Sequence, residues 1–176
     1  ITCGSVDDGK STLIGRLLLD ALSDLFAAPL YEIFAKHRAM GYRRFVDHMR
    51  SEGLLKLFEE KPVLLRLAAT LTRQWIDTSR ELADRLASDM GLLRRELLPL
   101  PAVARVTDIA GSRSDRHNDG RSVLVLTFED GSRIVYKPKD LRLDIAWHAM
   151  VSRLNNENPP VELRAVRAIA RDSYGW

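Results

Sequence analysis

The stretch Ser122-Val-Leu-Val-Leu-Thr-Phe-Glu-Asp-Gly-Ser-Arg-Ile-Val-Tyr-Lys137 decides the fold of this chain. Val123 to Leu126 is a short, β-branched-rich run without a helical period, so it predicts a buried strand within residues 122–128. Asp130-Gly131 is the dipeptide favoured in a two-residue hairpin turn. Ile134 to Lys137 then forms the return strand, and Pro138 ends it because proline has no amide proton for the ladder. The stretch therefore predicts an antiparallel β-hairpin.

On the N-terminal side of this hairpin, apolar residues recur at helical spacing. We expect helices over residues 11–25, 30–40 and 45–53, with Ala28-Pro29 interrupting the first two. The longest helix starts at Pro62, which follows acidic residues, and is closed by Met90-Gly91. Its expected apolar stripe consists of Leu64, Leu67, Leu71, Trp75, Leu82 and Leu86.

The pattern changes near Pro99-Leu-Pro101, and a sheet is expected from about residue 103. After the hairpin, Asp140 is the expected N-cap of one more helix. The stripe of that helix would comprise Leu143, Trp147, Met150 or Val151, and Leu154. Val166 to Ala170 is expected to begin another strand. The order of elements predicts an α+β fold, with a helical half over residues 11–97 and a small antiparallel sheet with one helix over residues 103–176.

Composition excludes several classes of protein. The 176 residues are 45% hydrophobic and 29% charged, which is the balance of a soluble globular domain and not of a disordered chain, collagen or a disulfide scaffold. The net charge of +3 is too small for a nucleic-acid-binding surface, so no nucleic-acid partner is expected. No apolar run approaches the ~18 residues that span a bilayer, so no membrane partner is expected.

The single cysteine and the two ends of the chain add two expectations. Cys3 cannot form an internal disulfide, so a reducing, cytoplasmic location is expected. The chain begins at Ile1 and stops within Asp172-Ser-Tyr-Gly-Trp176, which has the composition of an ordered segment. We therefore expect a fragment of a longer protein.

The first candidate site is the motif Gly4-x4-Gly9-Lys10-Ser11, which has the spacing of a nucleotide-binding phosphate loop. In such a loop Lys10 reaches the terminal phosphates, Ser11 holds Mg²⁺, and backbone amides cradle the anion. Residues 1–18 resemble the phosphate loop of the GTPase-type large subunit of sulfate adenylyltransferase. That resemblance implies a GTP-binding protein.

The rest of the chain departs from the GTPase pattern. Residues 19–100 are expected to be helical, whereas such a GTPase alternates strands and helices, and the guanine-reading motif Asn-Lys-x-Asp is absent. Asp108-Ile-Ala-Gly111 has the Asp-x-x-Gly form, but only two positions of it are fixed. Two interpretations stay open: a detached or fused segment over residues 1–27, or a working nucleotide site.

The second candidate site combines the loop residues Asp115 and His117 with Lys137 at the end of the return strand. Side chains two apart on a loop can reach one pocket and act as acid, base or phosphate contact. Protein kinases place a lysine on such a strand to hold ATP phosphates. The spacing alone equally allows a solvated loop histidine and solvated Lys137 and Lys139. No cluster of cysteine and histidine residues predicts a metal site.

Several motifs from residue 28 onward resemble the dehydratase domain of class II lanthipeptide synthetases. They are Leu30-Tyr-Glu-Ile-Phe, Gly53-Leu-Leu-Lys-Leu-Phe-Glu-Glu-Lys-Pro-Val-Leu65, Gln74-Trp75, Ser114-Asp-Arg-His-Asn-Asp-Gly-Arg-Ser-Val-Leu-Val-Leu-Thr-Phe128, Val135-Tyr-Lys-Pro-Lys-Asp-Leu-Arg-Leu-Asp144 and Asp172-Ser-Tyr-Gly-Trp176. The resemblance covers residues 28–176, in the family's order and spacing. It implies a helical part over residues 28–98 and a kinase-like small lobe over residues 103–176.

The resemblance also implies a function and roles for named residues. These enzymes use ATP and Mg²⁺ to phosphorylate Ser and Thr of a ribosomal precursor peptide, and then eliminate the phosphate to give dehydroamino acids. Lys137 matches the lysine that holds ATP phosphates, and Asp115 and His117 match the Asp-x-His pair used for elimination. The Mg²⁺-binding half of the kinase-like domain and the zinc cyclase domain are expected outside these residues, so the 176 residues alone are expected to be inactive. A non-catalytic scaffold is the remaining alternative.

The tryptophans and isolated histidines are expected to have structural roles. Trp75 and Trp147 lie on apolar stripes and are expected to pack in a core. His37, His48 and His148 lie on predicted helices without a partner at ligand spacing, so they are expected at the surface or in packing.

Overall fold

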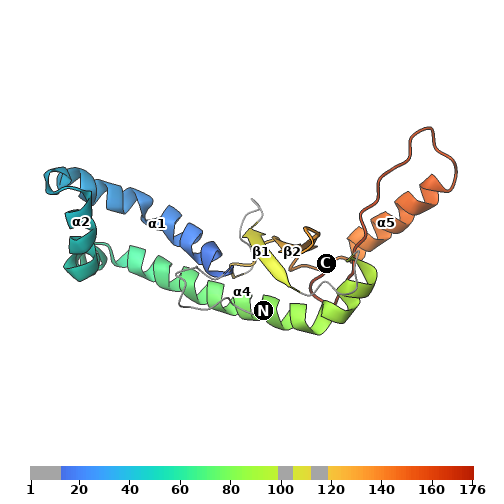
Figure 1. The fold of residues 1–176 in the computed structure, drawn as a ribbon, viewed down its shortest axis with the longest axis horizontal. Helices are drawn as coiled ribbons and strands as arrows, with labels where there is room; N and C mark the ends of the chain where they lie inside the picture. The colour runs from blue at the N-terminus through green and yellow to red at the C-terminus, as the bar shows by residue number, and fades with distance from the viewer. Residues whose placement is uncertain (1–12, 99–104, 112–118) are drawn as a thin grey trace. The chain divides into compact units, whose positions relative to one another are not determined.

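The computed structural model describes residues 13–98, 105–111 and 119–176 (Figure 1). In chain order the elements are α1 (Gly15–Lys36), the 3-10 turn η2 (Arg38–Met40), α2 (Tyr42–His48), the π-helical turn η3 (Met49–Gly53), α3 (Leu54–Glu60), α4 (Pro62–Glu96), β1 (Val106–Gly111), β2 (Leu124–Phe128), β3 (Arg133–Tyr136) and α5 (Arg142–Asn155). This order confirms the predicted α+β fold: a helical N-terminal half, then a small antiparallel sheet and one helix. The described residues divide into two compact units, one up to Arg80 and one from Glu81.

The unit up to Arg80 has a core made by α2, η3, α3 and the start of α4. Its buried members are Phe45, Met49, Leu57 and Leu64, and the partly buried residues packed on them are Leu25, Phe26, Leu30, Ile33, Phe34 and Phe58. The predicted interruption at Ala28-Pro29 is wrong, because α1 continues through Pro29. Apolar residues on both sides of Pro29 pack on this one core, and their burial outweighs the hydrogen bond that proline cannot donate.

α1 ends at Lys36, before the predicted end at Met40. The turn η2 follows, and Gly41 closes it at φ 81°, a backbone conformation that favours glycine. The side chain of Trp75 is half-buried, and its indole N–H donates to the carbonyl of Ile14 at 2.9 Å. The structural role predicted for Trp75 therefore agrees with its partly buried position.

Helix α4 is longer than predicted. It runs through Met90-Gly91 and ends at Glu96, after which the amides of Leu97 and Leu98 both donate to the carbonyl of Leu93 at 2.9 Å. Leu93 is completely buried, so packing beyond Gly91 holds the helix together at a residue that usually ends one. The predicted stripe is also only partly correct, because Leu67 is exposed and Asp89 is buried.

The sheet has the order β1-β2-β3 and is antiparallel throughout. Leu124, Leu126 and Phe128 of β2 are buried, as are Ile134 and Tyr136 of β3, which is the alternation expected of a sheet with one covered face. The hairpin turn lies at Asp130-Gly131 as predicted. Gly131 has φ 80°, and the Asp130 carboxylate accepts the Ser132 amide at 2.9 Å. The register pairs Tyr136 with Leu124, which fixes where β3 ends.

Helix α5 turns an unexpected face toward the protein. Its predicted apolar stripe is exposed at Leu143, Trp147, Met150 and Leu154, so the core role expected for Trp147 is wrong. Of the predicted stripe, Val151 is buried as expected, and the covered face also carries Asp144, seven residues earlier and therefore on the same side of the helix. Asp140 is not the N-cap, because Leu141 holds that position, but its carboxylate accepts the Arg142 amide at 2.8 Å.

The segment Val166–Ala170 forms no strand beyond single bridges. Ile169 and Trp176 exchange two backbone hydrogen bonds of 2.8 and 2.9 Å, and the Arg171 amide donates to the Tyr174 carbonyl at 2.8 Å. We call residues 169–176 the C-terminal hairpin.

Candidate functional site

Lys137 follows directly on β3, and its backbone is held by the C-terminal hairpin. The Lys137 amide donates to the Gly175 carbonyl, and the Gly175 amide donates to the Lys137 carbonyl, both at 2.9 Å. This antiparallel bridge extends the sheet by one residue beyond β3. These two hydrogen bonds hold the backbone of Lys137 in place.

The Lys137 side chain reaches the first turn of α5. Its Nζ donates to Asp144 Oδ1 at 2.9 Å, and Lys139 Nζ lies 3.6 Å from Asp144 Oδ2. The hydrogen bond from Lys137 is the main reason why the pKa of Asp144 lies below its ordinary value. Two ammonium groups thus face one carboxylate, and the surplus positive charge suits the cluster to an anionic group such as a phosphate.

A second polar cluster surrounds Asp89 of α4, whose side chain is 1% exposed. Its Oδ2 accepts the Tyr174 hydroxyl and the Trp176 indole N–H, each at 2.8 Å, and its Oδ1 lies 3.0 Å from the Arg171 guanidinium. All three partners belong to the C-terminal hairpin. A buried carboxylate is stable only with such charge-assisted partners, so this cluster attaches the hairpin to α4.

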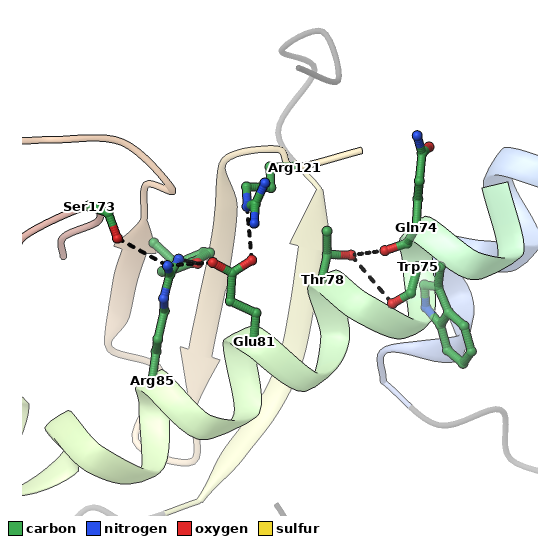
Figure 2. Close-up of polar contacts among 8 residues, drawn as sticks. Gln74, Trp75, Thr78, Glu81, Arg85, Arg121 and Ser173 are labelled. Carbon is green, nitrogen blue, oxygen red and sulfur yellow. Dashed lines mark hydrogen bonds and ion pairs between the residues drawn. The ribbon is translucent and has the colours of Figure 1, made fainter. Parts of the chain in front are cut away.

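Arg85, one turn before Asp89 on α4, and Glu81, one turn before Arg85, form a third group (Figure 2). Glu81 pairs with Arg85, and its Oε2 accepts the Arg121 Nε–H at 2.9 Å, which raises the pKa of Arg121. Arg85 also donates to the hydroxyl of Tyr136 and, at 3.3 Å, to Ser173 Oγ. Burial is the main cause of the raised pKa of Tyr136, partly offset by Arg85.

Arg85 also contacts an aromatic face. Its guanidinium carbon lies 4.2 Å from the ring centroid of Tyr174, within the range of a cation–π contact. The Arg85 side chain therefore joins the sheet, through Tyr136, to the C-terminal hairpin, through Ser173 and Tyr174.

The predicted site residues have different outcomes. Lys137 lies within the described residues and shares the partner Asp144 with Lys139. Six predicted site residues lie outside the described residues, so their roles stay predictions. They are Gly4, Gly9, Lys10 and Ser11 of the phosphate-loop motif, and Asp115 and His117. Four residues of these clusters were not predicted as site residues from the sequence: Asp144, Asp89, Glu81 and Arg85. An available signal for Asp89 was its place in the spacing of the buried Leu82, Leu86 and Leu93, which puts an acid on a buried stripe.

Two further properties concern only the described residues. Within residues 13–98, 105–111 and 119–176, no three His, Cys, Asp or Glu side chains gather as a metal site. Among the helices that the structure describes, none combines the length and the apolarity needed to cross a lipid bilayer.

Comparison with known families gives a match over more than half of the chain. The family described as "Domain of unknown function (DUF4135)" matches residues 62–176. These residues include α4, the sheet, Lys137, Asp144 and the C-terminal hairpin. DUF4135 is a domain found in class II lanthipeptide synthetases.

Matches to individual curated proteins are short. Sulfate adenylyltransferase subunit 1 of Agrobacterium fabrum is 55% identical over 57 residues, which is 30% of this chain and 12% of that protein. The bifunctional enzyme NodQ of Rhizobium sp. is 95% identical over 21 residues, which is 12% of this chain and 3% of that protein. The chain thus spans at most about an eighth of the length of these two relatives. Such partial matches do not favour the GTP-binding alternative.

Proposed function

The chain belongs to the DUF4135 family, and we propose that it is part of a lanthipeptide dehydratase that phosphorylates Ser and Thr of a precursor peptide and then eliminates the phosphate. The observation that carries the proposal is the pair of Lys137 and Asp144 at 2.9 Å, inside the matched residues. Protein kinases likewise pair a strand lysine with an acidic residue of a neighbouring helix, and the pair sets the lysine against the ATP phosphates.

In the proposed first step, Lys137 holds a phosphate of ATP. The peptide hydroxyl oxygen attacks the γ-phosphorus, the bond to ADP breaks, and the hydroxyl proton leaves to a base. The ammonium of Lys137 neutralises charge that would repel the attacking oxygen. Asp144 would orient Lys137 when no nucleotide is bound, and Lys139 would add positive charge at the same edge.

In the proposed second step, Asp115 and His117 act on the phosphorylated side chain. A base removes the proton on Cα, the Cβ–O bond breaks, and phosphate leaves with the bonding electrons. Serine then gives dehydroalanine and threonine gives dehydrobutyrine. Elimination needs a base at Cα and a proton donor or positive group at the departing phosphate, and an aspartate and a histidine two residues apart in the sequence are suited to these roles.

The test uses the complete protein that contains this chain, with its precursor peptide and ATP. Lys137→Ala should leave an unmodified peptide untouched, yet still eliminate phosphate from a peptide supplied already phosphorylated. Asp115→Ala or His117→Ala should let phosphopeptide accumulate. Mass spectrometry separates these products, because phosphorylation adds mass and dehydration removes water.

A matched control is Lys56→Ala, which removes an exposed lysine of α3 that pairs with Glu52 of η3. It should behave as wild type. If the Lys137→Ala enzyme modified the peptide at the wild-type rate, the proposed role of the pair would be wrong. If the wild-type protein gave neither phosphopeptide nor dehydrated peptide, a non-catalytic scaffold would replace this proposal.

A further inference from the structure

Gly175 lies at a junction where no side chain fits. A Cβ atom added there would lie 2.4 Å from the carbonyl oxygen of Ile169 and 2.4 Å from Cδ1 of Leu141. Real Cβ atoms do not approach other heavy atoms so closely, so any larger residue must displace its neighbours. Only glycine lets the C-terminal hairpin approach this closely.

Gly175 lies beside the two segments that carry Lys137 and Asp144. Its amide and carbonyl both bond to the backbone of Lys137. Leu141, which a Cβ at Gly175 would meet, is 1% exposed and stands immediately before α5, three residues ahead of Asp144. A shift at Gly175 would therefore move the lysine and its carboxylate partner relative to each other.

Gly175 is itself held by the residues on either side of it. Tyr174 and Trp176 both donate to Oδ2 of Asp89, and Arg171 pairs with Oδ1. Among the described residues, no buried side-chain nitrogen or oxygen lacks a hydrogen-bond partner. The hairpin is thus attached to α4 by a carboxylate whose two oxygens both have partners in the hairpin. This attachment favours one position of Gly175 over others.

We propose that Asp89 and Gly175 are positioning residues for Lys137: Asp89 fixes the C-terminal hairpin on α4, and Gly175 transmits that position to the lysine and to α5. The inference rests on the proposed role of Lys137 in binding ATP. It adds a determinant of that role which lies on α4, outside the strand and helix that carry the Lys137–Asp144 pair.

The experiment measures the Lys137 amine directly, in the complete protein that contains this chain. Reductive methylation followed by peptide mass spectrometry gives the labelling rate of Lys137, with Lys56 as an internal reference. Gly175→Ala and Asp89→Asn should raise the Lys137 rate several-fold, because the amine leaves Asp144 and becomes more accessible. Lys56 should not change.

Two matched controls make the same kinds of substitution at positions of α4 outside the Asp89 cluster. Gly91→Ala adds a methyl group where nothing lies within 4 Å, and Asp84→Asn changes an exposed acid. Both should keep the wild-type labelling rate. Trp176→Phe removes one donor to Asp89 and serves as a milder variant should Gly175→Ala not fold. It should give a smaller rise in the Lys137 rate.

A kinetic measurement separates positioning from a general loss of structure. Gly175→Ala and Asp89→Asn should raise KM for ATP on the order of tenfold, the effect of weakening one charge-assisted contact, with KM for the precursor peptide unchanged. Equal losses for both substrates would mean general damage and would overturn the proposal. Wild-type labelling of Lys137 in the folded variants would also overturn it, even where Lys137→Ala abolishes ATP use. If Lys137→Ala spared ATP use, the proposed function would fail, while the labelling rates would still decide whether Asp89 and Gly175 position the lysine.

Discussion

The indole N–H of Trp176 donates to the carboxylate of Asp89 at 2.8 Å, across 87 residues of sequence, and both side chains are buried. This bond and its neighbours connect the C-terminal hairpin to α4. Because the hairpin also bonds to Lys137, the stability of this cluster and the geometry of the proposed phosphate site depend on the same few residues.

The first prediction concerns the energy of the Asp89 cluster. Asp89→Ala leaves the Trp176 indole N–H and the Arg171 guanidinium without their buried acceptor. We expect the free energy of unfolding to fall by about 3 kcal/mol, as when one partner of a buried charged pair is removed. Urea denaturation followed by circular dichroism measures it. Asp84→Ala, at an exposed position of the same helix, should change the value by at most about 0.5 kcal/mol. Equal effects of the two substitutions would contradict the assignment.

A second prediction concerns alkaline pH. Burial raises the pKa of Tyr136 and of Tyr174 above the ordinary value of 10.0. A raised folded-state pKa means that the stabilising contribution is complete below pH 10.0 and is lost as the pH rises through the folded value. With the exposed Tyr31 and Tyr42 replaced by Phe, ultraviolet titration should give a tyrosinate midpoint above 10.0 in the folded protein. A midpoint at or below that value would count against the buried environment described for these two rings.

The hairpin could be predicted from sequence because its determinants are local. The apolar run before Phe128, the Asp130-Gly131 turn and Pro138 act within a few residues of one another, and the structure has strands and turn where they indicate. The long helix and the division into helices and sheet followed from periodicity in the same way.

Errors arose where distant packing outweighed a local signal. Proline and glycine usually end helices, but apolar residues beyond Pro29 pack partly buried on the core of their unit, and Leu93 beyond Gly91 is fully buried, so both helices continue. On α5 the sequence pattern identifies an apolar stripe but does not show which face of the helix packs against the protein. Trp147 was therefore predicted to be buried, although it is exposed.

The candidate site was predictable only in part. Lys137 was singled out by its place after a strand and by the family resemblance, and its role in holding ATP phosphates stays a prediction. Its partner Asp144 and the Asp89 cluster depend on contacts between segments far apart in the chain, which composition and spacing do not specify. The roles of Asp115, His117 and the phosphate-loop residues stay predictions.

A third prediction tests the core of the unit up to Arg80. Leu57 is 1% exposed and belongs to the cluster of Phe45, Met49 and Leu64, whereas Leu55 on the same helix is 66% exposed. Leu57→Ala removes buried methyl groups and leaves a cavity, so it should lower the free energy of unfolding by about 3 kcal/mol. Leu55→Ala should cost less than about 1 kcal/mol. Chemical denaturation measures both, and a larger cost at Leu55 would mean that α3 packs through the opposite face.

The last prediction concerns acid pH and the pair of Lys137 and Asp144. The hydrogen bond from Lys137 holds the pKa of Asp144 below its ordinary value of 3.8. For an acid whose folded-state pKa is depressed, the stabilising contribution is complete above the unfolded value and is lost as the pH falls through the folded value. Wild type should therefore be more stable than Asp144→Asn at neutral pH, and the difference should shrink as the pH falls below 3.8. Because both side chains are partly exposed, high salt should also reduce the difference at neutral pH.

Unfolding free energies from denaturant titrations at several pH values give the comparison. The control is Asp84→Asn, at an exposed position of α4, which should show no such pH dependence relative to wild type. Asp140→Asn is less suitable, because Asp140 accepts the Arg142 amide at the start of α5. A difference between wild type and Asp144→Asn that stayed constant from neutral pH to well below 3.8 would show that the carboxylate charge does not hold Lys137 in place.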